Sequence, residues 1–376
     1  MKKKLGIYIH IPFCRSRCPY CDFYSNAGCQ KEDISRYAAA VAGQLRVWSR
    51  MCGEYTVDTV YFGGGTPTLL ALRDFGLLFD ALQGNYDIAP DAEISCECNP
   101  ATAGAEYLHE LRALGVNRLS IGAQSLDDGE LLSLGRIHTA SDFFRTFHDA
   151  RDAGFENISA DIMMGIPSQS TKSLIMTLKR LSELGPEHVS AYCLKIEEGT
   201  PFGKAAGRLL LPGEDEVAEM YLGIIQFLAG CGFVQYEISN FARAGYECRH
   251  NIKYWSCDEY LGFGASAHSC FGGERFACPA SLERFCRGEY VDESGRIKLT
   301  DTDLETEYVM LTMRRTTGLV AGEYARRFGS DPRKKYDARF RGFVRLGLVV
   351  ADESGYRFTP RGMLVSNSIL SSILDL

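Results

Sequence analysis

The sequence contains no hydrophobic run of the roughly 18 residues that a membrane-spanning helix requires. It also lacks an excess of positive charge: 41 Lys and Arg stand against 48 Asp and Glu, so no nucleic-acid partner is expected. The apolar segment Leu5–Ile11 is too short for a signal peptide and contains His10. These absences predict a cytoplasmic protein without a membrane span.

Low-complexity segments are absent as well, and the composition is that of a globular chain. Hydrophobic residues make up 45% and charged residues 24% of the 376 residues, which excludes disorder and a small disulfide-stapled scaffold. At about 150 residues per domain, the length predicts two or three domains.

Cysteine, by contrast, is abundant, with 14 residues in the chain. A reducing compartment disfavours disulfides, so metal or redox chemistry is the favoured role for cysteines that cluster. Most of them, Cys52 and Cys96 for example, lie among apolar or small residues and are interpreted as packing residues. Three cysteines that follow the first predicted strand are different.

Short β-rich segments alternate with helical periodicity through the first half of the chain. Six β/α units predict a parallel sheet covered by helices, either an open or incomplete barrel or a doubly wound sheet. In both folds ligands bind beyond the carboxyl ends of the strands, so the residues there are the candidates for function. The predicted strands are Leu5–Ile11, Thr56–Phe62, Glu93–Glu97, Arg118–Ala123, Ile158–Met163 and Val189–Leu194.

The regular alternation of predicted strands and helices ends after residue 201. A helix is expected at Asp215–Leu228 and a strand at Phe233–Ile238, followed by an irregular stretch at 239–273. We therefore expect three parts, residues 1–200, 201–298 and 299–376.

The last part is expected to form helices followed by a hairpin of Leu348–Val350 and Tyr356–Thr359. Within it, residues 323–345 hold eight Lys and Arg against three acids. A basic helix with a wing could bind nucleic acid, but a solvated helix face is favoured because the whole chain is acidic.

Cys14, Cys18 and Cys21 follow the first predicted strand with the spacing Cys-x3-Cys-x2-Cys. A zinc site usually takes four protein ligands in two close pairs, and the sequence holds no second Cys-x2-Cys pair. A four-iron cluster takes four thiolates, so three on one loop leave one iron open. Three unligated surface thiols are the alternative.

Polar and glycine residues lie at the ends of the other strands. Gly63-Gly64-Gly65-Thr66-Pro67 ends the second, where glycines let the backbone approach a ligand, although a plain turn has the same composition. Glu97 and Gln124 end the third and fourth, and Asp161 lies in the fifth, where an unpaired charge would be costly. Arg136 could hold a carboxylate through two bonds. Each alone could be a satisfied core residue; together they predict one binding face.

An open iron on a Cys-x3-Cys-x2-Cys loop after the first strand resembles the radical S-adenosylmethionine (SAM) superfamily. The resemblance implies a 4Fe–4S cluster whose open iron is chelated by the amino and carboxylate groups of SAM. It implies reductive cleavage of SAM to methionine and a 5′-deoxyadenosyl radical, chemistry that belongs to the cofactor. It also implies an α/β fold, a partial (β/α)6 barrel with a C-terminal α+β winged-helix-like domain.

Three segments resemble the oxygen-independent coproporphyrinogen III oxidase family, and the likeness covers most of the chain. They are Tyr8–Cys14, the Gly-Gly-Gly-Thr-Pro run and Glu197–Phe202. The oxidases themselves carry a further cysteine two residues after the third ligand, where this sequence has Phe23. They also have a longer segment before the first ligand, where this sequence has 13 residues. Both departures count against oxidase activity.

The segment His250-Asn251-Ile252-Lys253-Tyr254-Trp255 resembles the His-Asn-x-x-Tyr-Trp motif of the HemW-type heme chaperones, another branch of this family. Imidazole is a good axial ligand of heme iron, and aromatic rings can cover a porphyrin face. On chemistry alone, a hydrogen-bonded structural histidine is the simpler interpretation. The motif favours a heme role for His250, with His268 as a second candidate near SAM or heme.

By this resemblance Cys14, Cys18 and Cys21 bind the cluster, and the chain binds heme and transfers it to an acceptor protein. No side chain is assigned a catalytic role. Two alternatives remain: oxidative decarboxylation of coproporphyrinogen III, and a radical SAM enzyme that modifies heme or another tetrapyrrole. One or two SAM sites, and a monomer or a homodimer, are compatible with the sequence. The residues placed at SAM are Tyr8, Gly64, Gly65, Thr66, Glu97, Gln124, Arg136 and Asp161, with Tyr20 and Cys193 at its edge.

Overall fold

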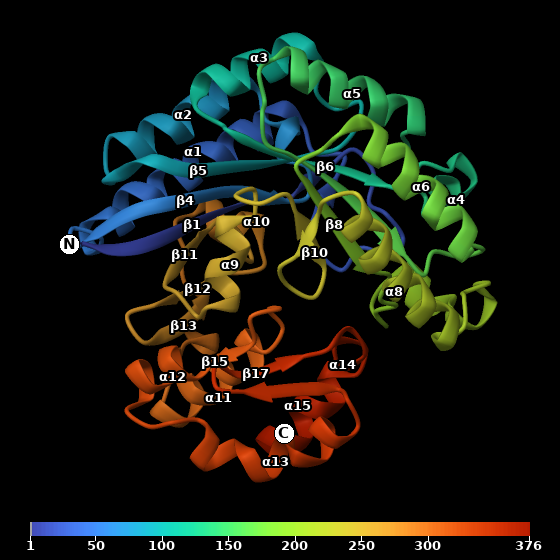
Figure 1. The fold of residues 1–376 in the computed structure, drawn as a ribbon. Helices are drawn as coiled ribbons and strands as arrows, with labels where there is room; N and C mark the ends of the chain where they lie inside the picture. The colour runs from blue at the N-terminus through green and yellow to red at the C-terminus, as the bar shows by residue number, and fades with distance from the viewer. Residues whose placement is uncertain (1) are drawn as a thin grey trace.

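The N-terminal half forms a partial barrel in the computed structural model, which describes residues 2–376 (Figure 1). Its parallel strands neighbour one another in chain order. A doubly wound sheet reverses its strand order midway. Because this order does not reverse, the incomplete barrel is the architecture formed. The strands are β1 (Lys3–Ile11), β4 (Tyr55–Gly64), β5 (Ile88–Cys98), β6 (Arg118–Gln124), β7 (Ile158–Met164) and β8 (His188–Cys193).

Helices form an arc over the outer face of this sheet (Figure 1). Two of them begin at capping boxes, Thr139 with Asp142 and Ser170 with Ser173, which satisfy N–H groups of the first turn. The helices of this part are α1 (Lys31–Trp48), α2 (Leu72–Gln83), α3 (Ala105–Leu114), α4 (Asp128–Ser133), α5 (Ala140–Asp152), α6 (Thr171–Leu184), α7 (Pro201–Lys204) and α8 (Glu214–Gly230).

Side chains along each strand alternate between the helix-covered face and the inside of the barrel. In β7, Ile158, Ala160 and Ile162 are fully buried, whereas the intervening Ser159 and Asp161 bond to each other. Strands covered on both faces are normally apolar throughout. The polar inward positions therefore indicate a barrel interior that holds polar groups.

The stretch 239–273, predicted to be irregular, is largely structured, so that prediction was wrong. Strand β11 joins the barrel sheet parallel to β1, and β10 pairs antiparallel with β8. The strands are too short for periodicity to show, and their pairing with distant strands supplies the stability. The elements between residues 234 and 298 are β9 (Val234–Gln235), β10 (Asn240–Ala242), α9 (Arg249–Trp255), β11 (Tyr260–Phe263), β12 (His268–Phe271), β13 (Glu274–Ala277), α10 (Leu282–Cys286) and β14 (Ile297–Lys298).

The C-terminal part has the helix, strand, two helices and hairpin of a winged helix. Its last two helices were not predicted, since serine-rich 366–374 has weak intrinsic helix preference and gains support by packing on α13. Among residues 2–376, no helix is long and apolar enough to cross a membrane. The elements are α11 (Asp301–Thr312), β15 (Leu319–Val320), α12 (Ala321–Phe328), α13 (Arg333–Arg345), β16 (Val349–Asp352), β17 (Gly355–Phe358), α14 (Pro360–Leu364) and α15 (Ser366–Leu374).

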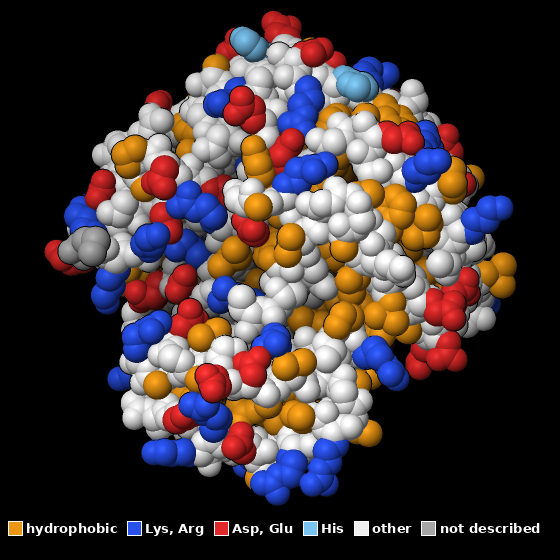
Figure 2. Space-filling view, viewed as in Figure 1, with side chains coloured by type: hydrophobic (Ala, Val, Ile, Leu, Met, Phe, Trp, Pro, Cys, Tyr) orange, Lys and Arg blue, Asp and Glu red, His pale blue; other side chains and the backbone are white. Residues whose placement is uncertain are grey.

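Three of the six basic side chains of α13 pair with carboxylates. Arg333 pairs with Asp331 at 2.7 Å, Lys335 with Glu305 at 2.8 Å, and Arg339 with Asp375 at 2.7 Å. Figure 2 shows blue and red side chains interspersed over the C-terminal domain on the visible face. This neutralisation is typical of a solvated helix face.

Candidate functional site

The cysteine loop, residues 12–25, follows β1 and carries Cys14, Cys18 and Cys21. Its far end is tied back to the barrel by His10, whose Nε2 lies 2.9 Å from the carbonyl oxygen of Tyr24. Burial raises the pKa of the thiols of Cys14 and Cys21, so each would favour its neutral form without a metal. Across the described residues, no three His, Cys, Asp or Glu side chains gather closely enough for a single metal ion. Cluster thiolates bind different irons and stand further apart.

The glycine run at the end of β4 lets the cysteine loop approach the barrel. A Cβ on Gly65 would lie 2.7 Å from the Phe13 carbonyl oxygen and 3.0 Å from the Cys14 sulfur. Gly64 has a φ of +114°, and a Cβ there would meet the His10 ring at 2.5 Å. Thr66 Oγ1 lies 3.8 Å from Cys14 Sγ. Glycine is therefore required here by close approach, not merely by a turn.

Two carboxylates face the cavity from neighbouring parts of the barrel interior. Glu97 Oε2 accepts a bond from the Gly64 N–H at 3.0 Å, and its Oε1 accepts one from the Tyr61 hydroxyl at 3.1 Å. Burial and the negative charge of Asp161 raise the pKa of Glu97 to about 7. Asp161 accepts hydroxyl bonds from Ser120 and Ser159, while burial raises its pKa. The pair offers negative charge to a cationic ligand.

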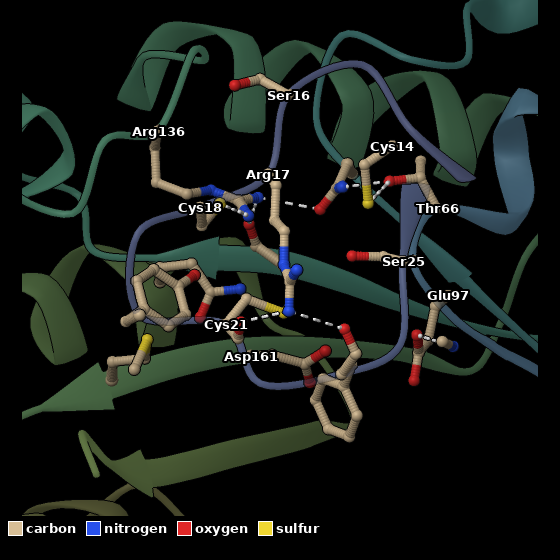
Figure 3. Close-up of a pocket in the computed structure, with 18 of the residues that line it drawn as sticks. Cys14, Ser16, Arg17, Cys18, Cys21, Ser25, Thr66, Glu97, Arg136 and Asp161 are labelled. Atoms are coloured by element: carbon tan, nitrogen blue, oxygen red, sulfur yellow. Dashed lines mark hydrogen bonds between the residues drawn. The ribbon is translucent and has the colours of Figure 1, made fainter. Parts of the chain in front are cut away.

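Arg136 contributes positive charge from the opposite wall (Figure 3). Its Nη2 donates to Asn99 Oδ1 at 2.8 Å, and its Nη1 lies 3.5 Å from Cys18 Sγ. Its buried Nε has no partner among the described residues. Gln124, at the end of β6, has a φ of +61°, which turns the chain at the cavity edge. The guanidinium thus retains donor capacity for an anionic group.

These side chains line one cavity of about 510 Å³ under the cysteine loop (Figure 3). Its wall includes all three loop cysteines. It also includes nine of the twelve predicted cofactor residues: Tyr20, Gly64, Gly65, Thr66, Glu97, Gln124, Arg136, Asp161 and Cys193.

The other three predicted residues lie outside this cavity wall. Tyr8 lies just behind it, close to Gly63, and its hydroxyl bonds to His10 Nδ1 at 2.9 Å. His268 is exposed at the start of β12 and pairs in register with Ala277 of the neighbouring strand β13. Strand β11 lies between β12 and β1, so His268 is not part of this cavity wall, and its expected role near SAM or heme stays a prediction.

His250, for which a heme role is predicted, is enclosed by hydrogen-bond partners. The side chain is 1% exposed, and its two ring nitrogens lie 2.8 Å from Thr59 Oγ1 and 2.8 Å from the Tyr254 hydroxyl. Burial and the nearby charges of Lys253 and Arg118 lower its pKa to about 3. In this conformation neither nitrogen is free to bind heme iron, so the simpler interpretation of a hydrogen-bonded structural histidine fits.

Several cavity residues escaped prediction. Asn99 bridges Arg136 and Thr66, donating to the threonine at 2.7 Å. It directly follows β5, so its place after a strand was a usable signal. Tyr61 and Ser120 lie at inward positions of β4 and β6, and only the alternation of polar and apolar residues could have identified them.

The donor set fits a cluster and SAM. Three thiols on one loop border a cavity that also holds a glycine cradle, two carboxylates and an arginine with an unpartnered Nε. Thiolates hold iron–sulfur clusters. The carboxylates suit an ammonium and a sulfonium group, and the guanidinium suits a carboxylate.

Comparison with known proteins agrees with this geometry. The Radical SAM superfamily model matches residues 8–181, and the HemN C-terminal domain model matches residues 299–365. The chain is 35% identical to the heme chaperone HemW of Bacillus subtilis over 98% of each chain. It is 35% identical to that of Escherichia coli over 80% of each. In fold it is similar to coproporphyrinogen III oxidase (HemN) from Escherichia coli, with a TM-score of 0.86, 24% identity, and coverage of 99% of this chain and 90% of the other.

Proposed function

This chain belongs to the HemW family of radical SAM proteins, and from that premise we propose that it is a heme chaperone. It would bind heme beside a SAM-coordinated 4Fe–4S cluster and pass the heme to an acceptor protein. Superfamily membership implies the cluster and SAM. Besides the family relationship, the observation that supports heme binding is the apolar and cationic rim of the cavity.

In this proposal Cys14, Cys18 and Cys21 hold three irons as thiolates and leave the fourth for SAM. Glu97 and the backbone at Gly64 receive the amino group of SAM, and Arg136 receives its carboxylate. A cluster held by these cysteines would, when reduced, supply the electron for reductive cleavage of SAM. The hydrogen bond from Asn99 to Thr66 links the side of the cavity that holds Cys14 to the side that holds Arg136.

Heme would lie at the rim. Phe23 and Ile137 line the cavity mouth and are 68% and 65% exposed, an unusual position for large apolar side chains. Arg15 and Arg17, on the same rim, are also exposed. An apolar surface flanked by guanidinium groups suits a macrocycle with two propionates.

Phe23 also supports the chaperone over the oxidase. It stands at the position where the oxidases carry a further cysteine, and a phenyl ring cannot ligate iron. The fold likeness to the coproporphyrinogen oxidase extends over nearly the whole chain, but it concerns the fold alone.

A heme titration of the anaerobically reconstituted protein, followed by Soret absorbance, tests the proposal. We expect saturable one-to-one binding that Phe23→Ser weakens at least fivefold. Leu132→Ser is the matched control, because Leu132 is 78% exposed and lies outside the cavity wall. Absence of saturable binding would refute the chaperone role. Conversion of coproporphyrinogen III with loss of carboxylates, measured by mass, would establish the oxidase instead.

A further inference from the structure

Helix α9, which carries the His-Asn-x-x-Tyr-Trp motif, closes the end of the barrel opposite the cysteine loop. His250 contacts Thr59, and Lys253 Nζ lies 2.7 Å from Asp58 Oδ1, both in the first half of β4. These two charged side chains are only 5% and 9% exposed. Glu93 accepts bonds from two N–H groups of the first turn of α9, at 2.9 and 3.0 Å. The helix is thus anchored inside the barrel rather than presented to a ligand.

One path of contacts leads from α9 to Glu97. The His250 ring stacks on Tyr61 with centroids 5.3 Å apart and an interplanar angle of 26°. The Tyr61 hydroxyl donates to Glu97 Oε1 at 3.1 Å, and the other carboxylate oxygen receives the Gly64 N–H. The position of the imidazole therefore sets the position of the hydroxyl that orients Glu97.

A second path leads from α9 to Asp161. The Cys248 N–H, at the start of the helix, donates to the Tyr236 hydroxyl at 3.2 Å. That hydroxyl lies 2.7 Å from His188 Nε2, and His188 Nδ1 lies 2.8 Å from Ser159 Oγ. Ser159 donates to Asp161 Oδ1 at 2.8 Å. Each step is a hydrogen bond between buried or half-buried groups, where such bonds are strongest.

We propose that α9 is a positioning element for the SAM pocket, holding Glu97 through His250 and Tyr61 and holding Asp161 through Tyr236, His188 and Ser159. His250 then acts as a positioning residue and not as a heme ligand. This inference rests on the part of the proposed function that places SAM against these two carboxylates, and it is independent of where heme binds.

The test measures SAM affinity from the change that SAM causes in the electron paramagnetic resonance spectrum of the reduced cluster. Tyr61→Phe removes one hydroxyl and keeps the ring, and we expect it to weaken SAM binding about three- to tenfold. His250→Gln, which keeps a donor and an acceptor, should weaken it less than His250→Ala. Tyr246→Phe is the matched control, since no hydrogen bond of its hydroxyl occurs within the described residues. In all variants the Soret maximum of bound heme should stay unchanged.

The variants distinguish an error in the placement of SAM from an error in the positioning role of α9. If Glu97→Gln leaves SAM affinity unchanged, the SAM placement itself is wrong. If Glu97→Gln weakens SAM but Tyr61→Phe and His250→Ala do not, the positioning role is wrong. A shifted Soret maximum in His250→Ala at unchanged SAM affinity would instead show that His250 is a heme ligand. Should His250→Ala not fold, Tyr61→Phe and His188→Gln still decide between these outcomes.

Discussion

Desolvation and the negative charge of Asp161 both raise the pKa of Glu97. The side chain lies one residue before the end of β5, and the negative charge of Asp161 acts on it from β7. Two bonds from Gly64 and Tyr61 favour the charged form but do not outweigh these effects, so the pKa rises to about 7. A carboxyl group that titrates near neutrality makes cation binding sensitive to pH.

We therefore predict that SAM affinity falls as the pH is lowered from 8 to 6. The raised pKa means that Glu97 is largely protonated at pH 6, where it no longer offers a charge to the cationic ligand. The expected loss is on the order of three- to tenfold over this interval. Equilibrium binding at both pH values measures it, with Glu97→Gln as the reference. An equally steep pH dependence in Glu97→Gln would contradict the assignment.

A second prediction at this scale concerns Cys18, whose sulfur lies 3.5 Å from Arg136 Nη1. Cys18→Ser should abolish a full SAM-binding cluster, because serine replaces a thiolate ligand. Since Cys18 is not in the hydrophobic core, the melting temperature of the apo chain should change by no more than about 2 °C. Iron and sulfide analysis after reconstitution and a thermal scan measure the two effects. Retention of the cluster would refute the ligand assignment.

At the scale of elements, the turn after β4 is constrained by the loop after β1. A side chain on Gly65 would collide with backbone atoms of Phe13, which cannot move without shifting Cys14. The two segments are brought together by parallel pairing of β1 with β4, which aligns His10 with Gly63 and Ile11 with Gly64. The strand register therefore places the glycines beneath the cysteines.

We predict that Gly65→Ala lowers cluster occupancy by at least half and destabilises the chain by about 1–3 kcal/mol through overpacking. Gly76→Ala is the matched control: Gly76 lies in α2 with open space at its Cβ, so alanine should stabilise the helix by up to about 1 kcal/mol. Iron content and denaturant unfolding distinguish the two variants. Equal cluster occupancy in both would show that the close approach is not needed.

At the scale of the whole molecule, the C-terminal domain is joined to the α9 segment by specific bonds. Arg327 donates to the carbonyl oxygens of Ser256 at 3.1 Å and Cys257 at 2.9 Å, and its guanidinium lies 5.0 Å from the Tyr308 ring centroid. The backbone of Ile238 also donates to Arg314. Through these contacts the domain supports the segment that closes the barrel.

Arg327→Ala should therefore lower the melting temperature by about 2–4 °C, the effect of losing roughly 1 kcal/mol in a chain of a few hundred residues. Arg326→Ala, at the neighbouring exposed position, is the control and should change it by less than 1 °C, as about ±0.5 kcal/mol is usual for such sites. Differential scanning calorimetry compares them. Equal shifts would show that the Arg327 contacts do not join the two parts.

The sequence by itself determined the β/α order, the cysteine loop after β1, the polar residues at strand ends and the helices that pack outside. These follow from local spacing, because periodicity, caps and ligand intervals are properties of neighbouring residues. It did not show that β11 extends the sheet, since a four-residue strand carries too little pattern.

Only the tertiary structure decided where the His-Asn-x-x-Tyr-Trp motif lies. The motif alone favours a heme role for His250, but the path of the chain places α9 at the barrel end opposite the cysteines, where His250 bonds to Thr59, 191 residues away in sequence. The partners that Tyr61 and Asn99 meet in the cavity were likewise decided by strand register. Which inward side chains meet across a barrel depends on pairing between distant strands, and no local pattern in the sequence contains that information.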